Sequence, residues 1–238
     1  MRKVSVRNIA AHKLRLALTV LAVVLGTAFI SGAFMFTNSL DATFKSAVSS
    51  AYDGVDAVVS PGEDTPGIPA SVREEIAADD KVNDVNINLS QNIVLANEEE
   101  EPFQVGGGTS TLSIWYDSEN VVGAQHSLIE GEAPTAADEV VLNQQGAETF
   151  GISVGDELLV VDPQERHEVT VTGIYEEELD TSTTLTAYMP EADYLERYTL
   201  DGITNQLIIS AAEGTSDTDL AAHLEENYEG IEVETGDA

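Results

Sequence analysis

Hydrophobic and polar positions divide the chain into a short, uniformly apolar segment and a long region of mixed character. Residues 16–36 are mostly large apolar side chains, and no charged side chain occurs from residue 16 to residue 40. As an α-helix, this core spans about 31 Å, close to the thickness of the hydrocarbon layer of a bilayer. Apolar residues occupy every face, so lipid or a large protein core has to surround it. The pattern predicts a transmembrane helix over residues 16–37.

The side chains expected to hold this helix in the bilayer are large and apolar, with one glycine where a neighbouring helix can approach. They are Leu16, Leu21, Leu25, Gly26, Phe29, Ile30, Phe34 and Phe36. Beyond them, Leu40, Phe44 and Val48 recur every four residues, which is the spacing of one helix face. We therefore expect the helix to leave the membrane as a helical stalk over residues 38–52.

A cleaved signal peptide is the alternative interpretation of this segment, with Ser31 and Ala33 as a small-x-small cleavage site. Two features favour the membrane anchor. The apolar run is longer than the roughly 7–15 residues of a signal peptide, and the helical pattern continues into the predicted stalk. An intact N-terminus in membrane extracts would reject the signal peptide, and with it a secreted enzyme.

Short apolar runs alternate with turn-forming residues in the rest of the chain, which predicts an α+β fold. Two stretches each follow the order strand, helix, strand. Their strands are expected near residues 55–59, 82–89, 92–95, 205–210 and 231–233, and their helices over residues 70–78 and 220–227, the latter capped by Ser216. Two such units separated by an insert are typical of a split βαβ, ferredoxin-like domain. Residues 53–119 and 200–238 are predicted to form it.

Residues 120–199 are predicted to form an inserted β-rich subdomain. Strands are expected at residues 139–142, 158–161 and 168–174, and a short helix at residues 144–150. Trp115, the only tryptophan, lies just before this insert and is expected to anchor a hydrophobic core.

Charge gives the apolar helix a direction across the membrane. The first fifteen residues contain no acid and carry half of all the bases, namely Arg2, Lys3, Arg7, Lys13 and Arg15. All 43 acids follow residue 40, where only five bases occur. Because positive flanks stay in the cytoplasm, residues 1–15 are expected to be a cytoplasmic interfacial segment and the main domain to lie outside the plasma membrane. Nucleic acid is a poor partner for so acidic a domain.

No motif in the chain predicts catalysis, a cofactor or a metal site. Residues 151–155 match the pattern G-x-S-x-G, but a helix precedes the serine and a strand follows it, the reverse of a nucleophile elbow. No P-loop sequence occurs, so ATP hydrolysis is expected in a partner. The histidines are widely separated and are expected on the surface or in loops, and the chain has no cysteine.

Several segments together resemble the start of MacB/FtsX-type ABC transporter permeases, in a form close to that of actinobacteria. In the membrane region these are residues 6–19, the Leu-Gly pair at 25–26 and residues 37–40. In the outer region they are residues 130–134, 138–142, 151–156 and 169–174, the last with Gly173. They occur in the family's order along most of the chain, and the outer ones resemble the MacB-like periplasmic core domain.

The resemblance implies a membrane permease subunit that is not itself an enzyme. Its implied partners are a cytoplasmic ABC ATPase subunit, a second permease subunit, the lipid bilayer and an unidentified extracytoplasmic substrate or partner. ATP-driven closure would move the outer domains through the stalks. The family carries three further transmembrane helices, which these 238 residues do not contain. We therefore expect the N-terminal portion of a longer permease, with a stand-alone single-pass binding or sensor protein as the alternative.

Overall fold

The structure is a computed structural model that describes residues 13–51, 54–63, 65–105, 110–117, 121–123, 126–177 and 184–236. Within these ranges, the side chains of residues 13–16, 38, 40–51 and 177 are not described. The chain separates into two compact units, Met1–Val48 and Ser49–Ala238.

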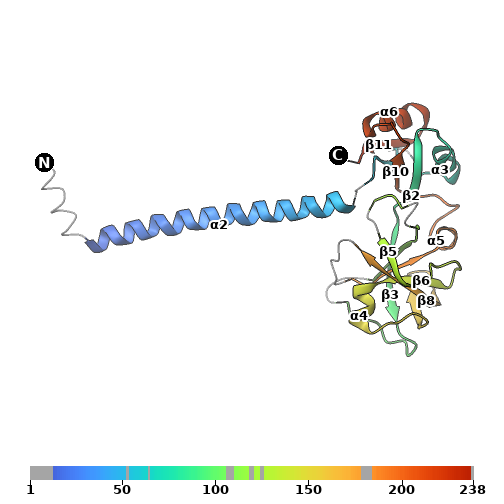
Figure 1. Ribbon diagram of the computed structural model, residues 1–238, viewed down its shortest axis with the longest axis horizontal. Helices are drawn as coiled ribbons and strands as arrows, with labels where there is room; N and C mark the ends of the chain where they lie inside the picture. The colour runs from blue at the N-terminus through green and yellow to red at the C-terminus, as the bar shows by residue number, and fades with distance from the viewer. Residues whose placement is uncertain are drawn as a thin grey trace. The chain divides into compact units, whose positions relative to one another are not determined.

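One uninterrupted α-helix, α2 (Lys13–Ala51), contains the predicted membrane segment and nearly all of the predicted stalk (Figure 1). No proline occurs in these 39 residues, and Gly26 and Gly32 are the only residues of very low helix propensity. The helix continues through residue 37, where the membrane span and the stalk are expected to meet. Both predicted segments are therefore parts of one helix.

The first sheet of the Ser49–Ala238 unit has four strands with the order β11-β1-β10-β2, and all neighbours are antiparallel. The strands are β1 (Ala57–Pro61), β2 (Val82–Ile87), β10 (Leu207–Ala211) and β11 (Ile231–Thr235). Helix α3 (Ala70–Ala77) connects β1 to β2, and α6 (Asp217–Asn227) connects β10 to β11. The two predicted strand-helix-strand stretches therefore meet in one sheet.

Apolar side chains of both helices pack with this sheet. Ile76 of α3 and Leu224 of α6 are fully buried in the same core as Leu207 and Ile209 of β10. Ser216 caps α6 as predicted, because its hydroxyl accepts a hydrogen bond of 3.1 Å from the amide of Asp219, but the helix begins at Asp217, before the predicted start at residue 220.

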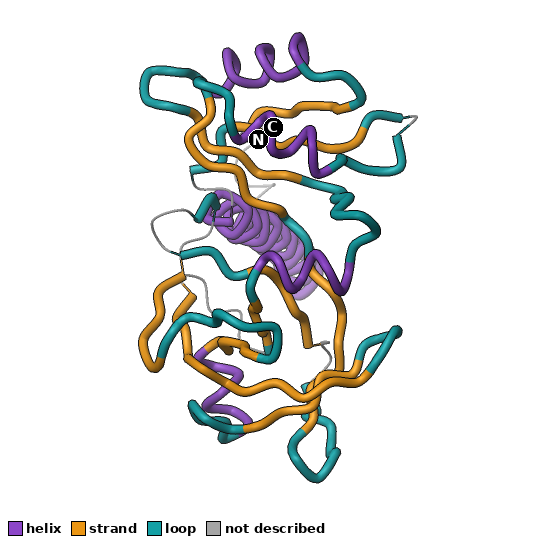
Figure 2. The backbone as a smooth tube through the Cα atoms, turned by 90° about the vertical axis from the view of Figure 1, so that its right-hand side faces the viewer, coloured by secondary structure: helices purple, strands orange, loops and turns teal. Residues whose placement is uncertain are grey.

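The second sheet has seven strands, β3 (Ser90–Ala96), β4 (Ser110–Ile114), β5 (His126–Gly131), β6 (Glu139–Asn143), β7 (Glu157–Val161), β8 (Arg166–Glu177) and β9 (Thr186–Met189). Their order is β5-β8-β6-β9-β4-β3-β7, and β8 also pairs with β7. Six strands therefore form a closed ring, and β5 is attached to β8 beside it (lower half of Figure 2). Of two short helices, α4 (Gln144–Phe150) connects β6 to β7, and α5 (Glu191–Tyr198) follows β9.

Two glycines allow β5 to lie against β8. A Cβ atom at Gly131 would lie 2.1 Å from the Thr172 carbonyl oxygen, and one at Gly173 would lie 2.8 Å from the Glu132 carbonyl oxygen. Gly131 also has a φ of +78°, which favours glycine. Both glycines belong to segments that carry the family resemblance. The close approach of β5 and β8 is a physical reason for glycine at these two positions.

The strand pairing differs from the predicted subdomain boundary at residue 119. Strands β3 and β4 lie before that boundary, yet they pair with each other and with β7 and β9 of the barrel. Only Asn88 and Leu89 separate β2 from β3, so the chain passes from one sheet to the other without a long linker. Helix α5, which has eight residues, was also not predicted.

The segment with the G-x-S-x-G pattern is a tight turn from α4 to β7. Gly151 ends α4 in the left-handed conformation with a φ of 69°, and Gly155 has a φ of 96°. The amide of Ser153 donates a hydrogen bond of 2.8 Å to the Asp156 carboxylate. The glycines therefore shape a connection and do not present a nucleophile, as the order of elements predicts.

Candidate functional site

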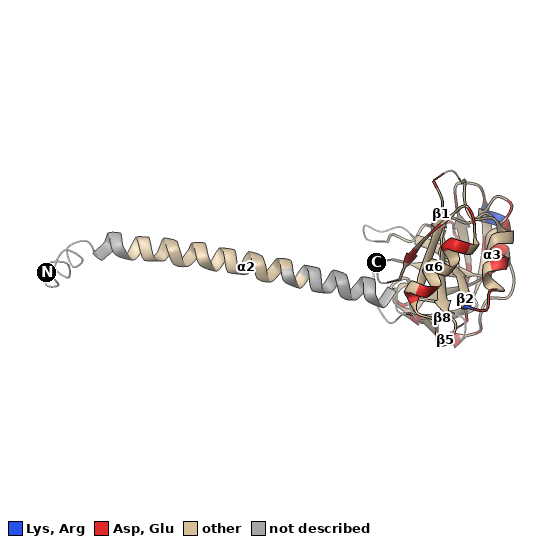
Figure 3. Cartoon of the chain, turned by 90° about the horizontal axis from the view of Figure 1, so that it is seen from above, with Lys and Arg blue, Asp and Glu red and all other residues tan. Residues whose placement is uncertain are grey.

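Helix α2 carries an apolar segment long enough to cross a membrane. The segment Ala17–Thr37 has a mean hydropathy of 2.1, and none of it is buried. Its large side chains are exposed on all faces, from 52% for Leu21 to 78% for Phe29. No Asp, Glu, Lys or Arg occurs in this segment, and in Figure 3 its described part carries no red or blue. A helix apolar all round has no face suited to water.

The predicted anchor residues that the structure describes all belong to this exposed surface. They are Leu21, Leu25, Phe29, Ile30, Phe34 and Phe36. A Cβ atom at Gly26 or Gly32 would meet no other atom within 4 Å, so both glycines face open space. The backbone of Leu16 and of the stalk residues Leu40, Phe44 and Val48 is helical, and their side chains lie outside the description.

The predicted topology residues lie mainly outside the described part of the chain. Arg2, Lys3 and Arg7 fall before its first residue. Lys13 and Arg15 begin helix α2, and only their backbone is described. Their role in orientation therefore stays a prediction from the sequence.

Polar contacts join the four-stranded sheet to the barrel, and Tyr116 is central to them. Tyr116 follows β4, and its hydroxyl accepts a hydrogen bond of 2.9 Å from the amide of Ile87 at the end of β2. Burial raises the pKa of Tyr116 far above its ordinary value, and the nearby Glu191 carboxylate adds to the shift. The Tyr116 hydroxyl therefore stays protonated and bridges the two sheets.

An ion pair spans the same junction between two helices. Nη1 of Arg73 on α3 lies 3.1 Å from Oε1 of Glu191, the first residue of α5. The Arg73 side chain is only 17% exposed, whereas both partners of the Arg166–Glu100 pair are more than half exposed. A partly buried, charge-assisted contact of this kind is stronger than an exposed one.

Two asparagines at the end of β2 complete the junction. The Asn86 side-chain oxygen accepts a hydrogen bond of 2.6 Å from the amide of Val122, in the segment before β5. Asn88 donates through its side chain to Gln206 at 2.6 Å and through its amide to the Gln206 carbonyl at 3.1 Å. Asn88 follows β2 and Gln206 precedes β10, so these bonds tie together the two chain segments that pass between the sheets.

A cavity of about 310 Å³ lies at this junction, and we call it the junction cavity. Its polar lining comes from Asn86, Asn88, Ser113, Tyr116, His126 and Tyr188, and aliphatic side chains complete it. The His126 ring stacks on Tyr188 with a centroid distance of 5.3 Å and lies 4.6 Å from the Trp115 ring. Trp115 is half-buried, a more exposed position than the predicted core anchor, and its ring contacts His126, Tyr188 and the fully buried Tyr175.

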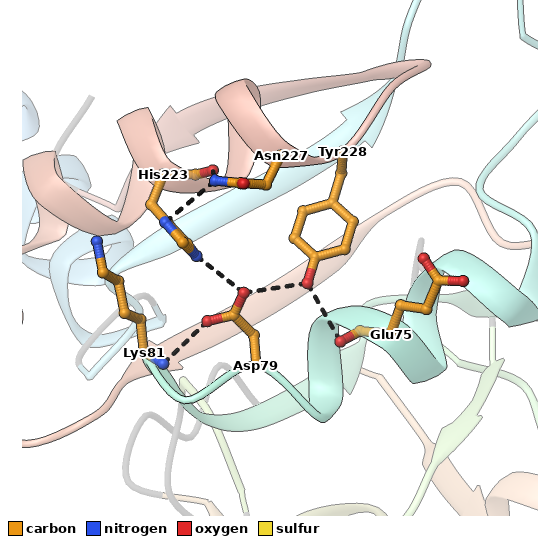
Figure 4. Close-up of polar contacts among 6 residues, drawn as sticks. All are labelled: Glu75, Asp79, Lys81, His223, Asn227 and Tyr228. Atoms are coloured by element: carbon orange, nitrogen blue, oxygen red, sulfur yellow. Dashed lines mark hydrogen bonds and ion pairs between the residues drawn. The ribbon is translucent and has the colours of Figure 1, made fainter.

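A second polar cluster joins the two strand-helix-strand units to each other (Figure 4). Nε2 of His223 on α6 lies 2.8 Å from the Asp79 carboxylate, and the Tyr228 hydroxyl donates to the same oxygen at 3.1 Å. Burial by itself raises the pKa of Asp79, but hydrogen bonds from the Lys81 amide, His223 and Tyr228 outweigh it and lower the pKa. Burial and the bond to Asp79 raise the pKa of Tyr228 to about 12.

Two histidines are not surface or loop residues, so that prediction is wrong for His126 and His167, whereas the side chain of His223 is 21% exposed. His126 is buried in β5, His167 is half-buried in β8, and His223 lies on α6. Neither ring nitrogen of His167 has a hydrogen-bond partner among the described residues. Burial lowers the pKa of His167, and the Arg197 guanidinium lowers it further. His12 lies outside the described residues.

Among the described residues, no group of three or more His, Asp or Glu side chains is arranged to hold a metal ion. The acids near residues 98–101 line a smaller cavity of about 170 Å³ together with Glu157 and Glu168. The contacts of Tyr116 with Ile87 and of Arg73 with Glu191 across the junction had no local sequence signal. The one available hint was that Arg73 is one of only five bases after residue 40.

Comparison with known proteins places this architecture in a family. A family model described as MacB-like periplasmic core domain matches residues 16–227. The periplasmic region of MacB from Actinobacillus actinomycetemcomitans has a similar structure, with a TM-score of 0.54 and 13% identity over 80% of this chain and 94% of that chain. The extracellular domain of the noncanonic ABC-type transporter YknZ from Gram-positive bacteria gives a TM-score of 0.50 and 15% identity, over 75% of this chain and 98% of that chain. Comparison with curated protein sequences found no match.

At 13% and 15% sequence identity, the structural similarity to these two proteins shows a shared fold. The family match is broader, because it begins at residue 16 within α2 and ends at residue 227, the last residue of α6. It therefore includes the apolar helix, the barrel and most of the four-stranded sheet. The chain belongs to the family of the MacB-like periplasmic core domain, found in ABC transporter permeases.

Proposed function

We propose that the chain is the N-terminal portion of a membrane-spanning permease subunit of an ABC transporter. The observation that carries this proposal is the exposed apolar helix Ala17–Thr37, followed in the same chain by a MacB-like domain. The N-terminal segment would lie in the cytoplasm and the Ser49–Ala238 unit outside the plasma membrane.

In this proposal, the subunit transmits force and does not catalyse a reaction. A cytoplasmic ABC ATPase hydrolyses ATP, and a second permease subunit completes a dimer. The motion passes through α2 and moves the outer domains, for export, extraction or transmembrane signalling of an unidentified substrate or partner. The continuity of α2 supports this role, because an unbroken helix transmits displacement along its axis.

We assign residues to these roles in three groups. Leu16, Leu21, Leu25, Gly26, Phe29, Ile30, Phe34 and Phe36 anchor the helix in lipid. Arg2, Lys3, Arg7, Lys13 and Arg15 set its orientation. Leu40, Phe44 and Val48 form the contact face of the stalk.

We further infer that the four-stranded sheet with α3 and α6 is a split ferredoxin-like subdomain, because its strand order and its two crossover helices match that arrangement. Residues 1–15 are the cytoplasmic segment, 16–37 the membrane span and 38–52 the stalk. The strand pairing supports residues 53–89 and 200–238 as the split subdomain and residues 90–199 as the inserted barrel.

Single cysteines test the proposed topology, because the chain contains none. Ser5→Cys marks the N-terminal segment, and Ser71→Cys marks an exposed position on α3. A membrane-impermeant maleimide added to whole cells is expected to label Ser71→Cys, and to label Ser5→Cys only after lysis. The cysteine-free parent is the control for background. Labelling of Ser5→Cys in intact cells, or extraction of the full chain by carbonate, would contradict the proposal.

The coding DNA after codon 238 separates the permease from a stand-alone membrane-anchored binding or sensor protein. The permease predicts three further apolar helices in the same reading frame and an adjacent ATPase gene. A stop codon, with the 238-residue product present in membranes, would contradict the permease. Both candidates predict the same topology, so the cysteine experiment and this one test different statements.

A further inference from the structure

His167 lies on β8 with both ring nitrogens buried, and neither has a hydrogen-bond partner among the described residues. Side chains alternate along a strand, so His167 shares a face of β8 with the buried Val169, and Arg166 and Glu168 point to the other face. Val160, opposite His167 on β7, is fully buried. His167 is therefore a polar ring in a mainly apolar position, where unpaired nitrogens cost stability.

Among the described residues, three charged groups act on the His167 ring, and none of them bonds to it. The Arg197 guanidinium on α5 opposes a proton on the ring, whereas the carboxylates of Asp162 and Glu165, in the turn between β7 and β8, favour one. Burial is the largest effect, and together with Arg197 it lowers the pKa of His167 below its ordinary value near 6.5. The ring is therefore neutral at neutral pH.

Both carboxylates near His167 hold α5 to the β7–β8 turn. Oδ2 of Asp162 accepts a hydrogen bond of 2.8 Å from the Tyr198 hydroxyl, and Oδ1 accepts from two amides of the turn at 2.7 and 2.8 Å. The Glu165 carboxylate pairs with the Arg197 guanidinium. In this arrangement neither ring nitrogen of His167 reaches a carboxylate, so a protonated ring gains an acceptor only if these contacts rearrange.

Helix α5 connects this turn to the junction between the two sheets. Glu191, its first residue, pairs with Arg73 of α3 at 3.1 Å. Arg197 and Tyr198, at its other end, hold the β7–β8 turn. With eight residues, α5 is only about 12 Å long, so a displacement of one end is passed to the other. The contacts at the two ends of α5 are therefore mechanically linked.

We propose that His167 is an acid-sensitive latch, whose protonation releases the C-terminal end of α5 from the β7–β8 turn and loosens the Arg73–Glu191 pair at the junction. A protonated imidazole has two N–H donors, and Arg197 repels its charge. The ring can gain acceptors only from the two carboxylates that hold α5. The latch requires only the fold of the Ser49–Ala238 unit, so it can fail while the transport role stands, and the reverse.

Hydrogen exchange of α5 tests the latch. The full chain in lipid nanodiscs is measured by mass spectrometry at pH 7 and pH 5, with correction for the intrinsic effect of pH on exchange. The protection of the α5 amides is expected to fall about tenfold at pH 5, which corresponds to a tenfold difference in proton affinity between the closed and open states. Helix α4 is the internal control, because it belongs to the same barrel and contains no histidine. Unchanged protection of α5, or an equal fall in α4, overturns the proposal.

Variants of two histidines assign the effect. His167→Leu removes the titrating ring and is expected to keep the protection of α5 nearly equal at pH 7 and pH 5. His167→Gln, which is polar but does not titrate, decides the question if His167→Leu does not fold, as judged by circular dichroism. His223→Gln is the matched control on α6 and is expected to retain the acid-dependent fall in α5. A fall of the parent's size in a folded His167 variant overturns the proposal.

Acid is expected to destabilise the parent more than His167→Leu. Because the pKa of His167 is lowered in the folded state, the unfolded chain takes up the proton first as pH falls below about 6.5. Stability is therefore lost from there down to the lowered pKa, and no further loss from this ring follows below it. The urea midpoint of the parent should fall relative to that of His167→Leu between pH 7 and pH 5. A constant separation of the two midpoints overturns the proposal.

Discussion

The apolar residues of α2 and those of the Ser49–Ala238 unit are alike in type and opposite in environment. Leu25 on α2 is 60% exposed, whereas Leu207 in the four-stranded sheet is fully buried. Leucine gains free energy by leaving water in either place. The Ser49–Ala238 unit provides that burial within its own core, and the segment Ala17–Thr37 does not. The difference indicates that α2 is built for a second medium. Leu207→Ala and Leu25→Arg, each with a matched control, test this.

The largest effect is expected from truncating a core leucine. Leu207→Ala removes a fully buried side chain and should lower the free energy of unfolding of the Ser49–Ala238 unit by about 2–5 kcal/mol. Leu25→Ala is the matched change in α2 and should leave that unfolding transition unchanged. Urea unfolding of the full chain in detergent, followed by Trp115 fluorescence, measures both. An equal loss in the two variants would contradict the comparison.

The second effect concerns membrane insertion. Leu25→Arg places a charge near the middle of the apolar segment and should cost about 2.5–3.5 kcal/mol of insertion free energy. Leu200→Arg is the control, because Leu200 is 77% exposed and its replacement should change stability by less than about 0.5 kcal/mol. Carbonate extraction measures the fraction in the membrane. Retention of Leu25→Arg equal to that of the parent and of Leu200→Arg would contradict the expected cost of a charge in this segment.

The third effect depends on pH and concerns the Asp79 cluster. The pKa of Asp79 is lowered in the folded state, so its stabilising contribution is present above the ordinary pKa near 4 and is lost as pH falls through the lowered value. Asp79→Asn should cost about 1.5–3 kcal/mol at neutral pH, because several donors lose a charged acceptor.

Asp80→Asn is the matched control for Asp79→Asn, because Asp80 is adjacent and exposed. Urea unfolding at neutral pH and near pH 3 should show the difference between the two variants shrinking as the solution becomes acidic. A difference that stays constant between the two pH values would show that Asp79 acts without its charge.

The smallest effect is expected at the junction between the sheets. Arg73→Gln breaks the partly buried pair with Glu191 and should cost about 1 kcal/mol. Arg166→Gln breaks the exposed pair with Glu100 and should cost less than about 0.5 kcal/mol. Thermal unfolding of the full chain compares them. Equal midpoints would mean that the Arg73 pair does not hold the sheets together.

Local features of the fold were predictable from the sequence. Helix α4 begins and ends at the predicted residues, and Ser216 caps α6 as its sequence position indicates. Such features depend on residues within about one turn of each other. The assignment of β3 and β4 was not predictable, because a strand shows its apolar pattern but not its partners.

The junction between the sheets was also beyond the sequence. Tyr116 and Ile87 are 29 positions apart, and Arg73 and Glu191 are 118 apart. His126 gave no sign that it would be buried, since its neighbours on β5 are exposed. Contacts at such separations arise from the closure of the barrel and the order of the four-stranded sheet, which the strands adopt only together.

The sequence by itself determined the apolar segment, the charge step across it and the kind of elements that follow. Length, hydropathy and charge act through the solvent, so they need no knowledge of contacts. The tertiary structure decided which strands share a sheet, which polar groups meet at the junction and where the junction cavity lies. These depend on distances between residues far apart in the chain, and only the packed fold sets those distances.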